Sequence, residues 1–161
     1  MAPRAGALKK RFYVAVGRFV LTWSSMETGL DLLALSSTAA NSSARQKTPH
    51  QLGEKTKFVR QHLLPRLSGE HSAKLRSILE RIDQLSVQRH DVIHGAGIGE
   101  EMNGKAMVMT FASLLQPKGR PRRLPMTVTA DHLDKLTADI FDLWGDLLDF
   151  AEIAAREIRK N

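Results

Sequence analysis

The sequence contains no cysteine, which excludes disulfide bonds and any zinc site built from thiolates. It also has no long uncharged apolar run. The most apolar stretch, residues 14–35, is interrupted by Arg18, Glu27 and Asp31, so it does not predict a membrane-spanning helix. Residues 1–10 carry charge but no apolar segment typical of a secretory leader. We therefore expect a cytoplasmic protein that is not associated with a membrane.

Acidic residues are absent from the first eighteen positions, and the net charge is +7. The basic residues there are Arg4, Lys9, Lys10, Arg11 and Arg18. A second basic group, also without acids, consists of Lys118, Arg120, Arg122 and Arg123. Such clusters favour polyanionic partners, because lysine and arginine neutralise phosphates. We expect the second group to contact an RNA backbone, although a solvated turn would have the same composition.

The length of 161 residues and the hydropathy pattern predict one domain over residues 1–161. Apolar residues recur at steps of three and four over about 10–35, 49–64, 70–94 and 131–160, with Thr48 as the cap and Pro49 as the first residue of the second helix. Residues 1–10 would form a basic N-terminal arm. The predicted fold is all-α: an up-and-down bundle of about four helices, with a small β-hairpin inserted before the last long helix.

The predicted hairpin covers residues 105–129, with strands at Lys105–Leu115 and Leu124–Thr129 and the second basic group at its tip. Gly97, Gly99 and Gly104 indicate a flexible loop before it. Within the last helix, Gly145 would mark a close approach of two helices, because glycine is otherwise costly there.

The third helix carries the most informative segment, because a charged residue interrupts its apolar seam. After Leu75, Ile78, Ile82 and Leu85 the next seam position is Arg89, and His94 stands five residues later, before Gly95. Histidine moves protons near neutral pH, and the arginine fork matches a phosphate. An RNA phosphodiester with its 2′-hydroxyl requires only these two functions for cleavage. We therefore predict Arg89 and His94 as catalytic residues, and neither a metal nor a cofactor.

Arg89, His90 and His94 resemble the motif of the HEPN domains: an arginine, a polar residue and a histidine four to six residues after the arginine. The segment Trp23–Glu27 is also similar to that of many members. The resemblance implies a helical bundle that dimerises with two motifs facing one cleft. It also implies a metal-independent endoribonuclease, often a toxin paired with a nucleotidyltransferase-like antitoxin, with His90 and Glu27 as supporting residues. His90 stands where asparagine or aspartate is more usual, and the hairpin is not a general feature.

Other interpretations of these residues stay open. Arg89 could be structural, paired with Glu27, in a non-catalytic module that binds nucleotide, RNA or protein. His90 and His94 lie four residues apart, as in helical metal sites, with Asp91 beside them. The aspartates of the last helix could bind Mg²⁺ or form a solvated flank. The region 48–77 could be a DNA-binding helix-turn-helix, but its connection is longer than usual.

Overall fold

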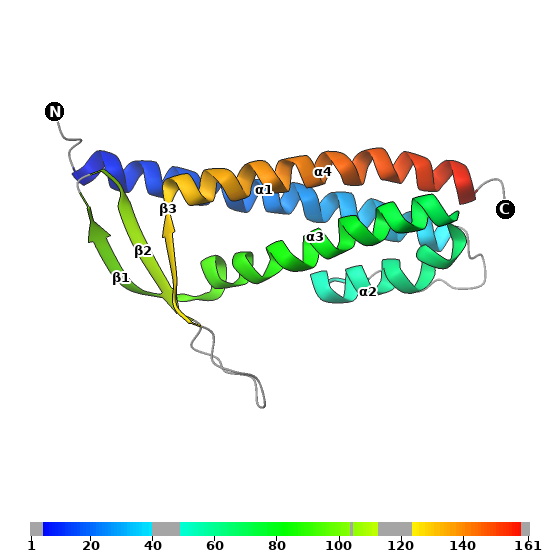
Figure 1. Ribbon diagram of the computed structural model, residues 1–161, viewed down its shortest axis with the longest axis horizontal. Helices are drawn as coiled ribbons and strands as arrows, with labels where there is room; N and C mark the ends of the chain where they lie inside the picture. The colour runs from blue at the N-terminus through cyan, green and yellow to red at the C-terminus, as the bar shows by residue number, and fades with distance from the viewer. Residues whose placement is uncertain (1–4, 40–48, 104, 113–123, 159–161) are drawn as a thin grey trace. The chain divides into compact units, whose positions relative to one another are not determined.

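A computed structural model describes residues 5–39, 49–103, 105–112 and 124–158. The described residues form a helical bundle with a small antiparallel sheet inserted before the last long helix, which confirms the predicted fold class (Figure 1). The elements are α1 (Ala5–Ala39), α2 (Leu52–His62), η1 (Leu64–Arg66), α3 (Gly69–His94), β1 (Ala96–Met102), β2 (Met107–Ala112), β3 (Met126–Thr129) and α4 (Ala130–Ile158). In this part of the chain, no helix combines the length and the apolar composition needed to cross a membrane.

The chain divides into two compact units, each built from segments far apart in the sequence. The first unit combines Met1–Leu21 with Gln84–Ala138, and the second combines Thr22–Asp83 with Asp139–Asn161. The sheet and the Arg89–His94 segment therefore belong to the first unit.

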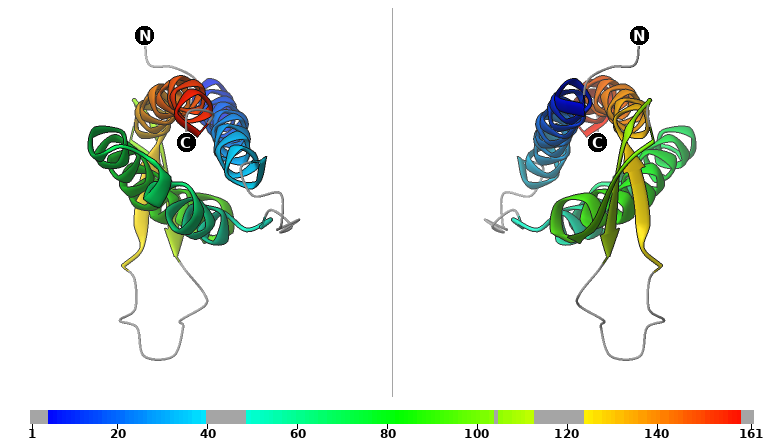
Figure 2. Two further views of the ribbon diagram at one scale, coloured as in Figure 1. Left: turned by 90° about the vertical axis from the view of Figure 1, so that its right-hand side faces the viewer. Right: turned by 90° about the vertical axis from the view of Figure 1, so that its left-hand side faces the viewer.

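The sheet has three strands in the order β1-β2-β3, one more than the sequence predicted (Figures 1 and 2). The predicted loop at Gly97 and Gly99 is wrong, because these glycines lie in β1. They flank an irregularity in the register with β2, where an extra residue is accommodated. Pairing with β2 supplies the backbone hydrogen bonds that the glycine-rich sequence does not favour by itself.

The two predicted strands correspond to β2 and β3, which pair from Val108 with Thr129 to Phe111 with Met126. The tip between them lies outside the described residues, and with it Lys118, Arg120, Arg122 and Arg123. The hairpin prediction is therefore confirmed for its strands, while the position of its basic tip stays a prediction.

Helix α4 follows its predicted apolar seam without exception. Its buried seam residues are Leu133, Leu136, Ile140, Leu143, Leu147, Phe150 and Ala154. In α1 the predicted seam residues from Phe12 to Leu33 are buried, with one exception: Val16 is half-buried, and its neighbour Ala15 is buried in its place. Helix α1 begins at Ala5, so the predicted arm at residues 1–10 is wrong from residue 5 onward. Lys9 and Lys10 lie on a helix whose apolar positions Leu8 and Phe12 are buried.

Helix α2 begins later than predicted. Pro49 precedes the helix, Thr48 lies outside the described residues, and the extended residue Gln51 is the N-cap. The carbonyl of Gln51 accepts the first helical hydrogen bond from the backbone N–H of Lys55, at 2.9 Å. The same lysine is buried and its Nζ lies 2.7 Å from Asp31 Oδ1, so an ion pair also fixes this turn.

The predicted close approach at Gly145 is wrong, because a Cβ atom placed there would meet open space. The close approach occurs at Gly29 of α1, in the same unit. A Cβ at Gly29 would lie 3.2 Å from Leu147 Cβ and 3.3 Å from Trp144 Cδ1. The glycine that permits close packing is therefore on the neighbouring helix.

Candidate functional site

The end of α3 is fixed by Gly95, as the sequence predicted. Its backbone N–H donates to the carbonyl of Asp91 at 3.0 Å, which completes the last turn. A Cβ at this position would lie only 2.2 Å from that carbonyl oxygen and 3.1 Å from Phe111 Cβ. Residue 95 therefore carries no side chain, and His94 occupies the last position of the helix.

Arg89 and His94 meet within one chain, although five residues on an ideal helix separate their directions by about 140°. Arg89 Nη1 lies 3.0 Å from His94 Nε2. The long arginine side chain spans the angular difference. Arg89 is half-buried with its Nε shielded from solvent, whereas His94 is exposed. The arginine is thus anchored by its stem and presents its outer nitrogens at the surface.

The contact fixes which of the two side chains donates in this hydrogen bond. A guanidinium nitrogen can only donate, so Nε2 of His94 accepts. An accepting Nε2 carries no proton, and the imidazole is then the neutral tautomer with its hydrogen on Nδ1. Because Arg89 occupies the Nε2 lone pair in this contact, Nε2 can act as a general base only once the guanidinium turns to another partner, such as a phosphate.

His90 lies on the same exposed face of α3, with its ring centroid 5.1 Å from that of His94. The pair has the spacing of a helical metal site. Within the residues that the structure describes, no three histidine, aspartate or glutamate side chains are grouped to hold a metal ion. The metal interpretation therefore gains no third ligand from this part of the chain.

Glu27, predicted as a supporting residue, accepts a hydrogen bond from Trp23 Nε1 at 2.6 Å. Trp23 is buried, and this bond satisfies its only polar atom. Glu27 belongs to the second unit and Arg89 to the first, so an ion pair between them stays a prediction. The contact that the structure gives Glu27 is therefore with Trp23 on its own helix.

A second histidine cluster, in the second unit, joins His71, Ser68 and Glu157. His71 Nδ1 lies 3.0 Å from Ser68 Oγ and 2.6 Å from Glu157 Oε2, and the backbone N–H of Ser68 donates to Glu157 Oε1 at 2.7 Å. A nucleophilic relay needs the hydroxyl and the carboxylate on different ring nitrogens. Here both contact Nδ1, so the cluster caps the start of α3 and does not activate the serine.

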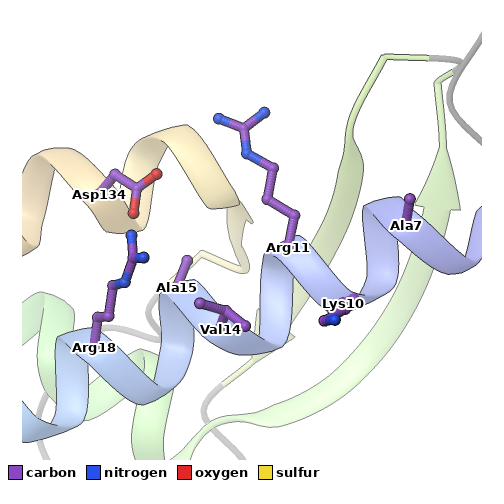
Figure 3. Close-up of a pocket in the computed structure, with 7 residues that line it drawn as sticks. All are labelled: Ala7, Lys10, Arg11, Val14, Ala15, Arg18 and Asp134. Carbon is purple, nitrogen blue, oxygen red and sulfur yellow. The ribbon is translucent and has the colours of Figure 1, made fainter.

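Sequence reasoning missed a basic groove in the first unit, shown in Figure 3. Its lining residues are Ala7, Lys10, Arg11, Val14, Ala15 and Arg18 of α1 and Asp134 of α4. The available signal was the repeat of Lys10, Val14 and Arg18 at steps of four, which places them in one stripe of a helix. That signal is hidden if the first ten residues are taken as an unstructured arm.

The chain matches no family model, no curated protein and no solved structure. The resemblance to HEPN domains therefore depends on the quoted residues alone, and function is argued from the site.

Proposed function

We propose that this chain is a HEPN-like, RNA-directed protein that cleaves RNA without a metal and acts as a homodimer. The observation that supports the proposal most directly is the 3.0 Å contact between Arg89 Nη1 and His94 Nε2. It brings a guanidinium, whose shape matches a phosphate, and an imidazole together at the exposed end of one helix.

The chemistry follows from these two groups. His94 Nε2 takes the proton of a ribose 2′-hydroxyl, and the 2′-oxygen forms a bond to the adjacent phosphorus. The bond from phosphorus to the 5′-oxygen breaks, and that oxygen receives a proton. Arg89 stabilises the negative charge on the phosphate during this exchange. The products are a 2′,3′-cyclic phosphate and a 5′-hydroxyl, and DNA is resistant because it lacks the 2′-hydroxyl.

Two proton transfers occur, one to a base and one from an acid, while each chain supplies one His94. A dimer with two motifs in one cleft would provide the second imidazole. RNA and a second copy of the chain are thus the partners of this proposal. The resemblance adds the expectation of a nucleotidyltransferase-like antitoxin. The composition adds the expectations of action in the cytoplasm and of phosphate contacts by Lys118, Arg120, Arg122 and Arg123.

The test is cleavage of labelled RNA by purified protein in EDTA, with analysis of the product ends. Wild-type protein should cut RNA, leave the cyclic phosphate and spare DNA of the same sequence. His94→Ala should lower the rate by about 10²- to 10⁴-fold, the usual loss for a general acid–base. Arg89→Ala should lower it as well, but melting curves must accompany that variant because the side chain is half-buried.

The matched control is His50→Ala, which removes an exposed histidine outside every helix of the described residues. It should cleave at the wild-type rate. If wild-type protein cuts no RNA, or His94→Ala cuts as fast as His50→Ala, the catalytic proposal is wrong. A non-catalytic binding module with a structural Arg89 would then be the better interpretation.

A further inference from the structure

The groove of Figure 3 has a volume of about 330 Å³ and lies along the first turns of α1. Three of its four charged lining residues are basic, namely Lys10, Arg11 and Arg18, and the fourth is Asp134. Ala7, Val14 and Ala15 provide its apolar part. A groove with apolar walls and an excess of one charge concentrates ligands of the opposite charge.

The basic residues are spaced along the length of the groove. Lys10 and Arg18 are eight residues apart on one helix, which corresponds to a rise of about 12 Å. A stacked nucleic-acid strand carries one phosphate about every 3.4 Å of its axis, so this distance spans about 3.5 phosphate spacings. The two ends of the groove can therefore contact different phosphates of one strand.

One of the cations near the groove is held by a weak, exposed contact. Arg11 pairs with Asp131, and the side chains are 53% and 72% exposed. An exposed ion pair of this kind contributes little free energy, since solvent screens it. A phosphodiester can therefore replace Asp131 as the partner of Arg11. Arg18 and Asp134 point toward one another across the groove (Figure 3).

An aromatic side chain stands beside the basic stripe. Tyr13 is 57% exposed and follows Lys10 by three residues on α1, so it lies beside Lys10 at the edge of the groove and not among its lining residues. Its neighbour Phe12 is buried and contacts the tyrosine ring edge-on, with centroids 5.9 Å apart, so the ring is supported from within. Proteins that bind single strands combine such a basic groove with an aromatic ring on which a base stacks.

We infer that the α1–α4 groove binds the backbone of single-stranded RNA through Lys10, Arg11 and Arg18, with one base stacked on Tyr13. The inference adds to the proposed function a binding surface whose residues do not include Arg89 or His94. It depends on that proposal only for the choice of RNA as the nucleic acid.

The test measures binding of a labelled 2′-O-methyl oligoribonucleotide, which has no free 2′-hydroxyl and cannot be cleaved by the proposed reaction. The double variant Lys10→Gln/Arg18→Gln should reduce the log–log salt dependence of binding by about 1.4, or about 0.7 for each lost phosphate contact. Tyr13→Leu should weaken binding by about 5- to 150-fold, while Tyr13→Phe keeps the ring and should bind like wild type.

The matched control for charge is Lys57→Gln/Arg76→Gln, which removes two exposed basic residues from the second unit. Its salt dependence should equal that of the wild type. The groove inference is overturned if the groove variant binds RNA like wild type, or if the charge control loses as much salt dependence as the groove variant. It is also overturned if the protein binds anionic phospholipid vesicles but not RNA. Melting curves should show that all variants fold, since every replaced side chain is exposed.

The two proposals can fail separately. If no RNA is cleaved but the groove variants lose binding, the ribonuclease proposal is wrong and the groove inference stands. If His94 proves essential for cleavage while the groove variants bind normally, the groove inference is wrong and the ribonuclease proposal stands.

Discussion

The imidazole of His71, in the first turn of α3, lies 2.6 Å from the carboxylate of Glu157, near the end of α4. The two residues are 86 positions apart in the sequence, and Ser68 contacts both of them. The backbone hydrogen bond from Ser68, together with the contact with His71, lowers the pKa of Glu157, although desolvation opposes this shift. We therefore expect the free energy of unfolding to depend on pH through Glu157.

Glu157→Gln should lower the melting temperature at neutral pH, because a carboxylate with a lowered pKa stabilises the fold when ionised. This stabilisation is complete above the ordinary glutamate pKa of about 4.3 and is lost as the pH falls through the lower pKa of the folded state. The difference in melting temperature between wild type and variant should therefore become smaller as the pH falls through that acidic range. Glu152→Gln, in an exposed pair with Arg156, should show little change at any pH. A difference in melting temperature that does not change with pH would contradict the lowered pKa of Glu157.

Gly95→Ala should destabilise the last turn of α3 and displace His94. The new Cβ would lie 2.2 Å from the carbonyl oxygen of Asp91, so the backbone must move. We expect a loss of about 1–3 kcal/mol in the free energy of unfolding, measured in urea, and reduced RNA cleavage. Gly69→Ala, at the other end of the helix, meets open space and should cost far less. Equal effects of the two substitutions would show that the end of α3 tolerates a side chain.

Gly145→Ala should raise the free energy of unfolding by up to about 1 kcal/mol, since alanine favours the helix and meets no neighbour. Gly29→Ala gains the same propensity but overpacks Leu147 and Trp144, which typically costs about 1–3 kcal/mol. The two variants should therefore shift the urea midpoint in opposite directions. A stabilising Gly29→Ala would mean that the neighbouring side chains relax freely.

The protein should scatter light as a dimer of about twice 17.9 kDa at micromolar concentration. Val87 is exposed and lies on the face of α3 that carries His90 and His94, as an interface near the motif requires. Val87→Asp should yield monomers with reduced cleavage, because a buried unpaired charge is costly. Leu32→Asp, an exposed apolar position in the second unit, is the control and should stay dimeric. A wild-type monomer would exclude the shared-cleft mechanism.

Local pattern predicted the helices well. The seam of α4 is buried at every predicted position, and the His94–Gly95 boundary ends α3 where the sequence placed it. A helix satisfies its own backbone hydrogen bonds, and its buried face repeats every three or four residues. The seam of a helix and its end can therefore be predicted from one segment of sequence. The start of α2 was wrong because Pro49 is permitted at a helix start but does not require one.

The sequence by itself determined the helical class, the apolar seams and the placement of Arg89 and His94 near one helix end. Tertiary structure decided the rest. Strand β1 exists through its pairing with β2, because a glycine-rich strand finds its hydrogen bonds only in a neighbour. Asp134 joins Lys10, Arg11 and Arg18 in one groove because α1 and the start of α4 pack together within the first unit. Periodicity records which face of a segment is buried, but only packing determines which segments that face meets.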